Sequence, residues 1–306
     1  EDGEDVQHDE RRETPTRGRE RITLNEVEEA VKSTPNWKAP GTDSIQGFWW
    51  KYLPSTRKAL CKVFNAWLED PRRISPEMMK GNTFLLFKKG DRKDPANSRP
   101  ITCLNVVMKI FTSVQKMKIE RVLLSNPQEK KLTLNQYGGR RGVLASKQAG
   151  LVEKWRKDIS KKKNIKYIEM YYDVTKAYDS VVHKTLVEKV REMGVREEIV
   201  GVVRRILTNT SLKLHCGGEE IGEVKVKRGV IQGDSLSPLL FIISINDVSK
   251  RLNGIAEMRG EDGMGRVFCM DDLKVTCKSS EEAAECHHVI QQEFQTLGMT
   301  INEKKC

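Results

Sequence analysis

Two stretches of sequence decide the expected fold: Ile168-Glu169-Met170-Tyr171-Tyr172-Asp173-Val174 and Phe268-Cys269-Met270-Asp271-Asp272-Leu273. Each is apolar or β-prone and carries aspartate at its end or in its middle, which predicts two neighbouring strands. Two carboxylates about 4 Å apart repel by around 4 kcal/mol at an effective dielectric constant near 20, so a fold tolerates them when a divalent cation neutralises them. If Asp173, Asp271 and Asp272 converge, they suit a pair of Mg²⁺ ions and the polymerisation of nucleic acid. For any single aspartate, a turn or a helix cap is the alternative.

The composition indicates a globular protein with a highly charged surface. The 306 residues are 38% hydrophobic and 32% charged, enough for one large core or two smaller ones. The formal net charge of +11 favours a polyanionic partner such as nucleic acid, and a basic protein without such a partner is the alternative. Residues 1–21 hold eight acids and five arginines and no aromatic residue, which predicts a disordered acidic and basic linker.

The cysteines indicate reduced thiols in an intracellular protein. None of the seven stands in a C-x-x-C spacing, and the count is odd, so neither a disulfide scaffold nor a zinc site is expected. We find no signal peptide and no apolar run long enough to span a bilayer, so no membrane partner is expected.

Local patterns place several elements. Thr23-Leu24-Asn25-Glu26 is a capping box that predicts a helix ending near Ser33. Asp179-Ser180 is predicted to cap a helix through Met193. The other expected elements are a strand over 83–87, a helix over 106–124, a hairpin around Gly217-Gly218, a helix with Pro238 in its first turn, a hairpin over 267–277 with Asp271-Asp272 at its tip, and a helix from 279 to Gly298. The five tryptophans (Trp37, Trp49, Trp50, Trp67 and Trp155) are expected in the core rather than as base-stacking platforms.

Six segments, taken in order from about Asn36 to the end, resemble the reverse transcriptase domain of non-LTR (LINE-like) retrotransposons, which is related to the group II intron enzymes. The segments are Asn36-Trp37-Lys38-Ala39-Pro40-Gly41-Thr42-Asp43; Phe87-Lys88-Lys89-Gly90-Asp91 with Arg99-Pro100-Ile101; Asp173-Val174-Thr175-Lys176-Ala177-Tyr178-Asp179-Ser180-Val181 (motif A); Arg228-Gly229-Val230-Ile231-Gln232-Gly233-Asp234-Ser235-Leu236-Ser237-Pro238 (motif B); Cys269-Met270-Asp271-Asp272 (motif C); and Leu297-Gly298-Met299-Thr300-Ile301-Asn302-Glu303-Lys304-Lys305 (motif D).

The resemblance implies roles for particular residues. Asp173 and Asp271 would hold two Mg²⁺ ions, for which Mn²⁺ could substitute, with Asp272 in support. Lys88 and Arg99 would bind the incoming triphosphate, for which a point charge and a planar fork are suited. Tyr178 would exclude a 2′-hydroxyl, or else be a core aromatic residue. The backbone of Gln232 and Gly233 would approach the nucleotide and template. Lys305 would protonate pyrophosphate, and Lys304 is the alternative for that role.

The implied fold is α+β: a right-hand polymerase with fingers over residues 22–164, in which palm segments interleave, and a palm over 165–306 that carries motifs A to D on an antiparallel sheet backed by helices. The implied function is RNA-directed DNA synthesis by two-metal nucleotidyl transfer onto a primer 3′-hydroxyl. The implied partners are an RNA template, a DNA primer or target DNA, and deoxynucleoside triphosphates, in a ribonucleoprotein of nucleus and cytoplasm. The basic residues Lys154, Arg156, Lys157, Lys161, Lys162 and Lys163 would follow template or primer phosphates, or else form a solvated helix face.

Two departures from the family pattern stand out. Cys269 occupies the position before x-Asp-Asp where the family normally has an aromatic residue, and Phe268 lies one position earlier. The sequence ends at Cys306, after motif D, so we expect the thumb and the endonuclease of the parent polyprotein to be absent and the fragment to extend primers weakly. The alternatives are a catalytically inactive, decayed or domesticated nucleic-acid-binding module, which Cys269 favours, and an RNA-dependent RNA polymerase, against which Tyr178 argues.

Overall fold

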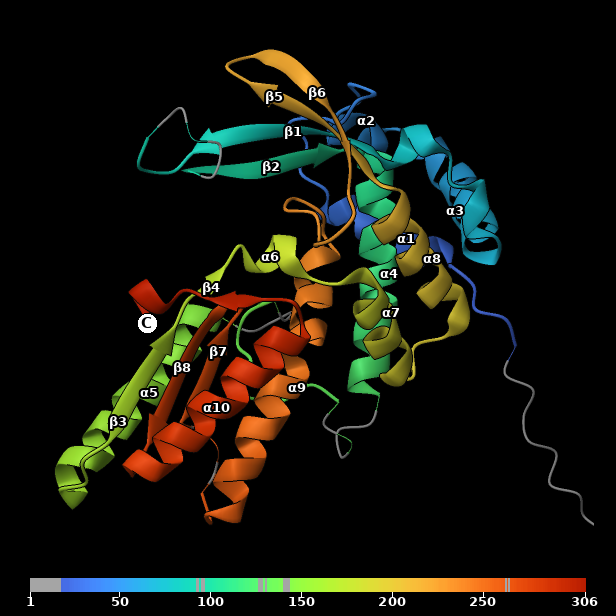
Figure 1. The fold of residues 1–306 in the computed structure, drawn as a ribbon. Coiled ribbons are helices and arrows are strands. Elements are labelled where there is room, and N and C mark those ends of the chain that lie inside the picture. The colour runs from blue at the N-terminus through green and yellow to red at the C-terminus, as the bar shows by residue number, and fades with distance from the viewer. Residues whose placement is uncertain are drawn as a thin grey trace, which may run out of the picture.

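The computed structural model describes residues 18–91, 94, 97–125, 129, 131–139, 144–261, 263 and 265–306. An upper lobe and a lower lobe enclose an opening on one side (Figure 1). Residues 1–17 of the predicted linker lie outside the described residues. In the rest of that segment, the carboxylate of Glu20 pairs with Lys118 at 2.7 Å. Within the described residues, no helix is long and apolar enough to cross a membrane.

The sheet of the upper lobe has the strand order β2-β1-β5-β6. Its strands are β1 (Lys80–Phe87), β2 (Ser98–Leu104), β5 (Ser211–Cys216) and β6 (Glu219–Lys225). Neighbouring strands are antiparallel except β1 and β5, which run parallel. The predicted hairpin around Gly217-Gly218 is therefore confirmed, and it joins a sheet whose first strands lie far earlier in the chain.

Helices pack below and beside this sheet around a continuous apolar core. They are α1 (Leu24–Ser33), α2 (Gly47–Tyr52), α3 (Ser55–Glu69), α4 (Val106–Leu124), α7 (His183–Glu192), α8 (Glu197–Asn209) and the 3₁₀ turns η1 (Pro71–Arg73) and η2 (Pro76–Met79). The capping box is confirmed at α1, where the Glu26 amide donates to Thr23 Oγ1 and the Thr23 amide donates to Glu26. The predicted bounds of α4 are also confirmed.

The lower lobe is built on a three-stranded antiparallel sheet of order β3-β8-β7. Its strands are β3 (Ile168–Tyr172), β8 (Asp272–Cys277) and β7 (Arg266–Cys269). The accompanying elements are α5 (Ala145–Lys163), α6 (Ala177–Ser180), α9 (Ser237–Met258), α10 (Ser280–Thr296), η4 (Glu303–Lys305) and the short pair β4 (Val174–Thr175) with β9 (Thr300–Ile301). This is the expected antiparallel sheet backed by helices.

The two faces of the lower sheet have different coverings. Because side chains alternate along a strand, Tyr172 and Glu169 point to opposite faces. Tyr172 donates to or accepts from His287 of α10 at 2.9 Å, whereas Glu169 pairs with Lys274, which also pairs with Glu153 of α5. One face is therefore packed on α10 and the other meets α5, as Figure 1 shows.

Two expectations about local structure were wrong. The helix predicted to start at Asp179-Ser180 is two elements, because α7 begins at His183, after an extended Val182. Between them, the carbonyl of Val181 accepts from the Gly229 amide at 2.7 Å, so the chain stays extended to meet motif B. Of the five tryptophans, Trp37, Trp49 and Trp155 are 66%, 53% and 48% exposed rather than in the core.

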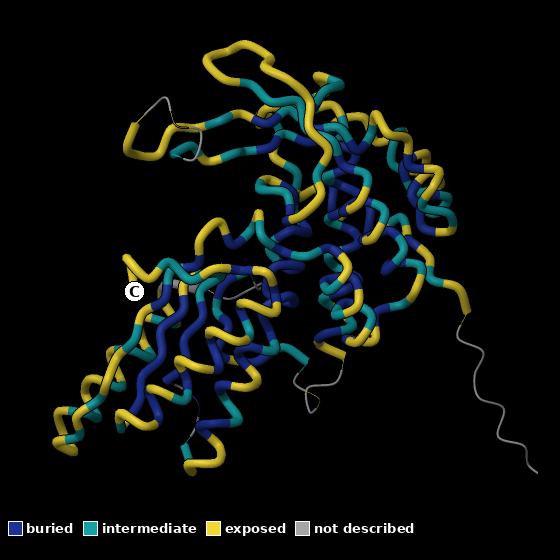
Figure 2. The backbone as a smooth tube through the Cα atoms, in the orientation of Figure 1, coloured by how far each residue is buried: buried dark blue, intermediate teal, exposed yellow. Residues whose placement is uncertain are grey.

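The lobes interleave in sequence. The β5–β6 hairpin belongs to the upper sheet although its residues follow motif A, and α5 contacts the lower sheet although it precedes motif A (Figure 1). The strand β6 is exposed along its length, whereas β8 is buried after its first residue (Figure 2). The division of the chain into fingers up to residue 164 and palm from 165 stays a prediction.

A buried ion pair ties β7 to α10. Arg266 is 0% exposed, and its guanidinium donates to the carboxylates of Glu282 and Glu261 and to the carbonyl of Thr276. Glu282 is also buried, so this pair excludes water.

We predict that Arg266→Met lowers the free energy of unfolding by about 3–5 kcal/mol, because it leaves the Glu282 carboxylate buried without its cation. Urea denaturation followed by circular dichroism measures this. The matched control is Arg259→Met, which breaks an exposed pair with Glu285 and should lower the free energy of unfolding far less, because solvent screens that pair. Equal losses in the two variants would contradict the prediction.

Candidate active site

The register of β3 against β8 places two aspartates at the same end of the ladder. Tyr172 and Leu273 are the last pair of the β3–β8 ladder; beyond them, Asp173 follows β3 and Asp272 is the first residue of β8. Adjacent strands lie about 4.8 Å apart, so these two carboxylates start from neighbouring backbone positions. Asp271 occupies the turn between β7 and β8, immediately before Asp272. The three predicted aspartates therefore follow or begin neighbouring stretches of backbone at one end of the sheet.

The charges of these aspartates influence one another. The pKa of Asp272 is raised by partial desolvation of its carboxyl group, although the residue as a whole is exposed, and then by the negative charges of Asp271 and Asp173. The pKa of Asp173 is lowered, chiefly by a hydrogen bond from Lys305. A depressed folded-state pKa means that the Asp173 contacts stabilise the fold above its ordinary pKa and are lost as the pH falls through the folded value.

The turn that carries Asp271 is held by a segment that the sequence did not single out. The amides of Met270 and Gly138 both donate to Oε1 of Gln136, at 3.2 and 2.9 Å. Met270 has a φ of 61°. A Cβ on Gly138 would lie 2.5 Å from the amide nitrogen of Met270. The Tyr137 amide donates to the Phe268 carbonyl at 2.8 Å, so this segment extends the sheet beside β7.

The aspartates face an open cleft between the lobes. Of the nine predicted site residues, all except Asp272 line it: Lys88, Arg99, Asp173, Tyr178, Gln232, Gly233, Asp271 and Lys305. Asp272 is exposed at the start of β8 beside the cleft. Residues from β1, β2, motif A, motif B, motif C and motif D therefore share one concave surface.

The end of the chain closes over Asp173. Lys305 Nζ donates to Asp173 Oδ2 at 2.7 Å, and Asn302 Nδ2 donates to the same oxygen at 3.1 Å. The Asn302 amide donates to the Asp173 carbonyl at 2.8 Å, which continues the β4–β9 ladder. Asn302 had no predicted role, and only the strand pairing shows that it meets motif A.

Two cations face the aspartates from the upper lobe. Lys88 follows β1, and its amide donates to the Asn97 carbonyl at 2.9 Å where the β1–β2 hairpin turns. Arg99 lies in β2 opposite Leu86. Both side chains are exposed, and the positive charge of Lys88 contributes to the lowered pKa of Asp173.

Tyr178 is a partly buried aromatic residue that also lines the cleft, and exclusion of a 2′-hydroxyl by its ring stays a prediction. Its ring stacks on Phe241 of α9 with centroids 4.7 Å apart and planes 13° from parallel. Burial and then the charge of Asp271 raise its pKa, so the hydroxyl stays protonated near Asp271. The ring is thus a packed side chain that also lines the cleft.

Gly233 has a local structural reason to be glycine. Its φ is 121°, and a Cβ there would lie 2.2 Å from the Thr102 carbonyl oxygen. The Gln232 carbonyl accepts from the Thr102 amide at 2.8 Å. Motif B therefore touches β2 of the upper sheet at this point, main chain against main chain.

The cysteine of motif C lies on the aspartate side of the sheet. Cys269 pairs with Asp272 across the β7–β8 hairpin, so the two side chains share a face. Phe268 points to the other face and is 1% exposed in the core. Phe268 therefore does not replace the missing aromatic ring in the cleft.

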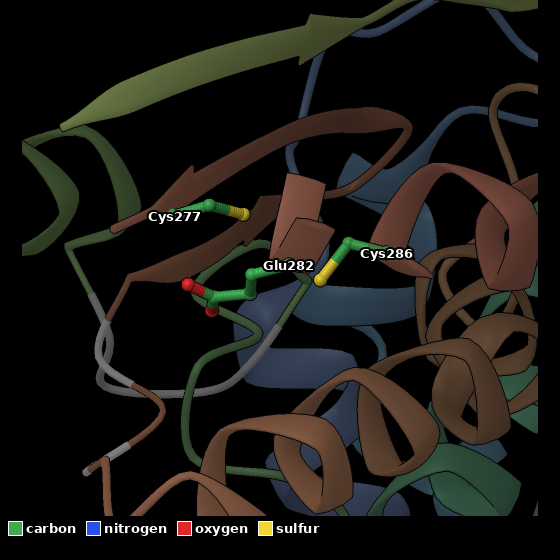
Figure 3. A group of neighbouring side chains, drawn as sticks. All are labelled: Cys277, Glu282 and Cys286. Carbon is green, nitrogen blue, oxygen red and sulfur yellow. The ribbon is translucent and has the colours of Figure 1, made fainter. Parts of the chain in front are cut away.

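A second group of possible ligands lies within the lower lobe. The sulfurs of Cys277 and Cys286 and the carboxylate of Glu282 lie within 4.8 Å of one another (Figure 3). Arg266 binds one Glu282 oxygen and lies 3.9 Å from the Cys286 sulfur, while the Lys278 amide donates to the other Glu282 oxygen at 2.8 Å. A cation here would have to displace the arginine, so the geometry favours a buried ion pair.

Comparisons with known proteins agree with this arrangement. Residues 87–306 match the family model described as "Reverse transcriptase (RNA-dependent DNA polymerase)". The chain resembles a structure of apo telomerase from Candida tropicalis with a TM-score of 0.55 at 15% identity, over 81% of this chain and 54% of that one. At this identity the likeness concerns the fold alone, and it supports the predicted right-hand polymerase fold.

Curated relatives come from mobile elements. The Pol polyprotein from type-1 retrotransposable element R2 of Nasonia vitripennis is 26% identical over 285 residues, which are 92% of this chain and 26% of the relative. The RNA-directed DNA polymerase from mobile element jockey of Drosophila melanogaster is 23% identical over 293 residues, 93% of this chain and 31% of the relative. The chain thus spans about a quarter to a third of the length of these relatives.

We predict that Lys305→Ala raises the pKa of the Asp173 carboxyl toward its ordinary value, because the Lys305 hydrogen bond is the largest cause of its depression. A ¹³C-detected carboxyl titration without divalent metal measures this. Lys304→Ala, which removes the neighbouring exposed lysine, should leave that pKa unchanged. The prediction fails if both variants shift it alike or if Lys305→Ala does not shift it.

Proposed function

Because the chain belongs to the reverse transcriptase family, we propose that it catalyses RNA-directed DNA synthesis. Its relatives include proteins of non-LTR retrotransposons, as the sequence motifs predicted. The reaction would join an incoming deoxynucleotide to a primer 3′-hydroxyl and release pyrophosphate. The observation that carries the proposal is the shared cleft, where Asp173 and Asp271 face cations from the upper lobe.

The donor set of the cleft suits divalent metal ions, which reverse transcriptases generally use. Hard carboxylate oxygens favour Mg²⁺ over softer metals, and the crowding of three negative charges gives a cation a reason to bind. We propose that Asp173 and Asp271 hold two Mg²⁺ ions with support from Asp272, and that Mn²⁺ can substitute. When bound, the metals would lower the pKa of the attacking hydroxyl and offset charge on the phosphates.

The other residues bind and orient. Lys88 and Arg99 would hold the triphosphate from the upper lobe, opposite the aspartates. Asn302 would fix the rotamer of Asp173 through their hydrogen bond. The Lys305 side chain would move from Asp173 to the leaving pyrophosphate and donate a proton to it. The position of Lys305 in the cleft supports this role.

Two residue groups would select the substrate. Tyr178 is held flat by Phe241, so its edge would meet the sugar and exclude a 2′-hydroxyl. Gln232 and Gly233 would present main chain to the nucleotide and template, and the contact with Thr102 fixes that main chain.

The wider biology follows from the relatives and is likewise proposed. The parent protein would carry further domains, among them a thumb and an endonuclease, and would copy its RNA at nicked target DNA. RNA template, DNA primer and deoxynucleotides would be its partners, in a ribonucleoprotein of cytoplasm and nucleus.

We predict that Asp271→Ala abolishes incorporation of dTTP on poly(rA)/oligo(dT) in Mg²⁺, because it removes a proposed metal ligand. The 306-residue chain is used first, and a version extended by the thumb of a relative raises the signal. The control is Asp247→Ala, which removes an aspartate paired with Lys189 outside the cleft and should retain incorporation. Incorporation that survives Asp271→Ala would refute the assignment.

The second candidate function is an inactive nucleic-acid-binding module, and Cys269 is the observation that favours it. Binding of the hybrid with no incorporation in Mg²⁺ or Mn²⁺, even with the thumb restored, would establish it. Restoring the ring with Cys269→Tyr separates a weakened enzyme from a dead one, since only the enzyme should gain activity.

We predict that Tyr178→Ala relaxes discrimination against ribonucleotides by about tenfold or more, because the ring no longer fills the space of a 2′-hydroxyl. Tyr178→Phe is the matched control and should retain discrimination, since it keeps the stacked ring. Ratios of kcat/KM for dTTP and UTP measure this. Unchanged ratios in Tyr178→Ala would remove Tyr178 from that role, and a wild-type preference for UTP would indicate an RNA polymerase.

A further inference from the structure

The aspartates and α5 lie on the same face of the lower sheet. Asp173, Tyr171 and Glu169 alternate along β3 and its end, so they share a face, and Lys274 shares it as the partner of Tyr171 across the ladder. Lys274 pairs with Glu153 of α5 at 2.7 Å. A duplex that leaves the aspartates along this face therefore runs beside α5.

The part of this face near β3 is open. Tyr171 is 52% exposed, and its ring lies under Lys274 Nζ at 5.0 Å from the centroid. The other face is closed by α10 and holds the buried Arg266. On the α10 face, Tyr172 and Phe268 are buried, so near the aspartates the exposed surface belongs to the face that bears α5.

The helix α5 is strongly basic. The helix carries seven basic and two acidic residues, and one of the acids, Glu153, is paired inward with Lys274. Lys154, Lys157 and Lys161 follow one another at helical spacing and are exposed; we name them the α5 ridge. Within the described residues, neither Lys154 nor Lys161 has a carboxylate oxygen within 4.0 Å. Trp155 and Leu151 are also exposed beside the ridge.

The ridge leads away from the aspartates. Only residues 164–167 join α5 to β3, so α5 runs outward and β3 returns to Asp173. Glu153 meets β8 two residues from Asp272, which is about 7 Å along a strand, and Lys161 lies about 12 Å further along the helix. At about 3.4 Å per nucleotide, the ridge reaches phosphates roughly two to six base pairs behind the primer end.

We propose that the α5 ridge binds the sugar–phosphate backbone of the newly made RNA–DNA duplex as it leaves the cleft. This inference rests on the proposed function for the identity of the duplex. Lys154 and Lys161 have no ion-pair partner among the described residues, and the ridge borders the face that bears the aspartates. Phosphate contacts of this kind give affinity without sequence preference.

The test is binding of a labelled DNA primer on an RNA template to the full chain, measured by fluorescence anisotropy in Ca²⁺ across a salt series. The variant K154E/K157E/K161E should weaken binding of a duplex of about 12 base pairs by ten- to a hundredfold near 0.15 M salt and reduce the salt slope by about 2 to 3. The matched control K32E/K62E/K184E reverses three exposed lysines on α1, α3 and α7.

A duplex of about 3 base pairs with the same overhang, held together by a covalent interstrand cross-link, should bind both variants more nearly alike, because it ends before Lys161. Equal losses in ridge and control variants, or an unchanged salt slope, would overturn the proposal. So would weakened binding to vesicles of anionic phospholipid with duplex binding intact. Asp271→Ala separates the two proposals: it tests incorporation, whereas the ridge is read from binding alone.

Discussion

The site depends on like charges crowded where two antiparallel strands meet. The register that pairs Tyr172 with Leu273 places Asp173 and Asp272 at the same end of the ladder, and the adjoining turn adds Asp271. Lys305 and Asn302 hold one of these carboxylates, and partial desolvation and repulsion raise the pKa of another. This arrangement is costly unless cations compensate it, so the local electrostatics and the proposed metal chemistry have one origin.

Much of the fold could be predicted because local signals agreed with tertiary packing. The capping box at Thr23, the helical spacing from Val106 and the glycine pair at 217–218 each fix structure within a few residues. The start of α7 could not be predicted from Asp179-Ser180, because the contact of Val181 with Gly229 overrides a local cap. The exposed Trp49 was missed because composition does not tell which face of the short helix α2 meets the core.

The candidate site divides in the same way. The order of the motifs identified eight residues that line one cleft, although their individual roles stay proposals. Asn302, Gln136 and Gly138 were missed because each contacts the main chain of a segment that is distant in the sequence. Nothing in their local sequence indicates that partner. The sequence likewise did not show that Phe268 cannot replace the aromatic ring absent at Cys269, because only the alternation of side chains along β7 places Phe268 in the core.

The parallel pairing of β1 with β5 bears on how the chain acquires its structure during synthesis. Lys80 to Phe84 find their partners in Ser211 to His215, so one edge of β1 stays unpaired until the ribosome has delivered that hairpin. Contacts so distant in sequence form slowly, and an open strand edge is a template for misassociation. This polypeptide therefore most needs a chaperone during synthesis, when its N-terminal half has been made and the β5–β6 hairpin has not.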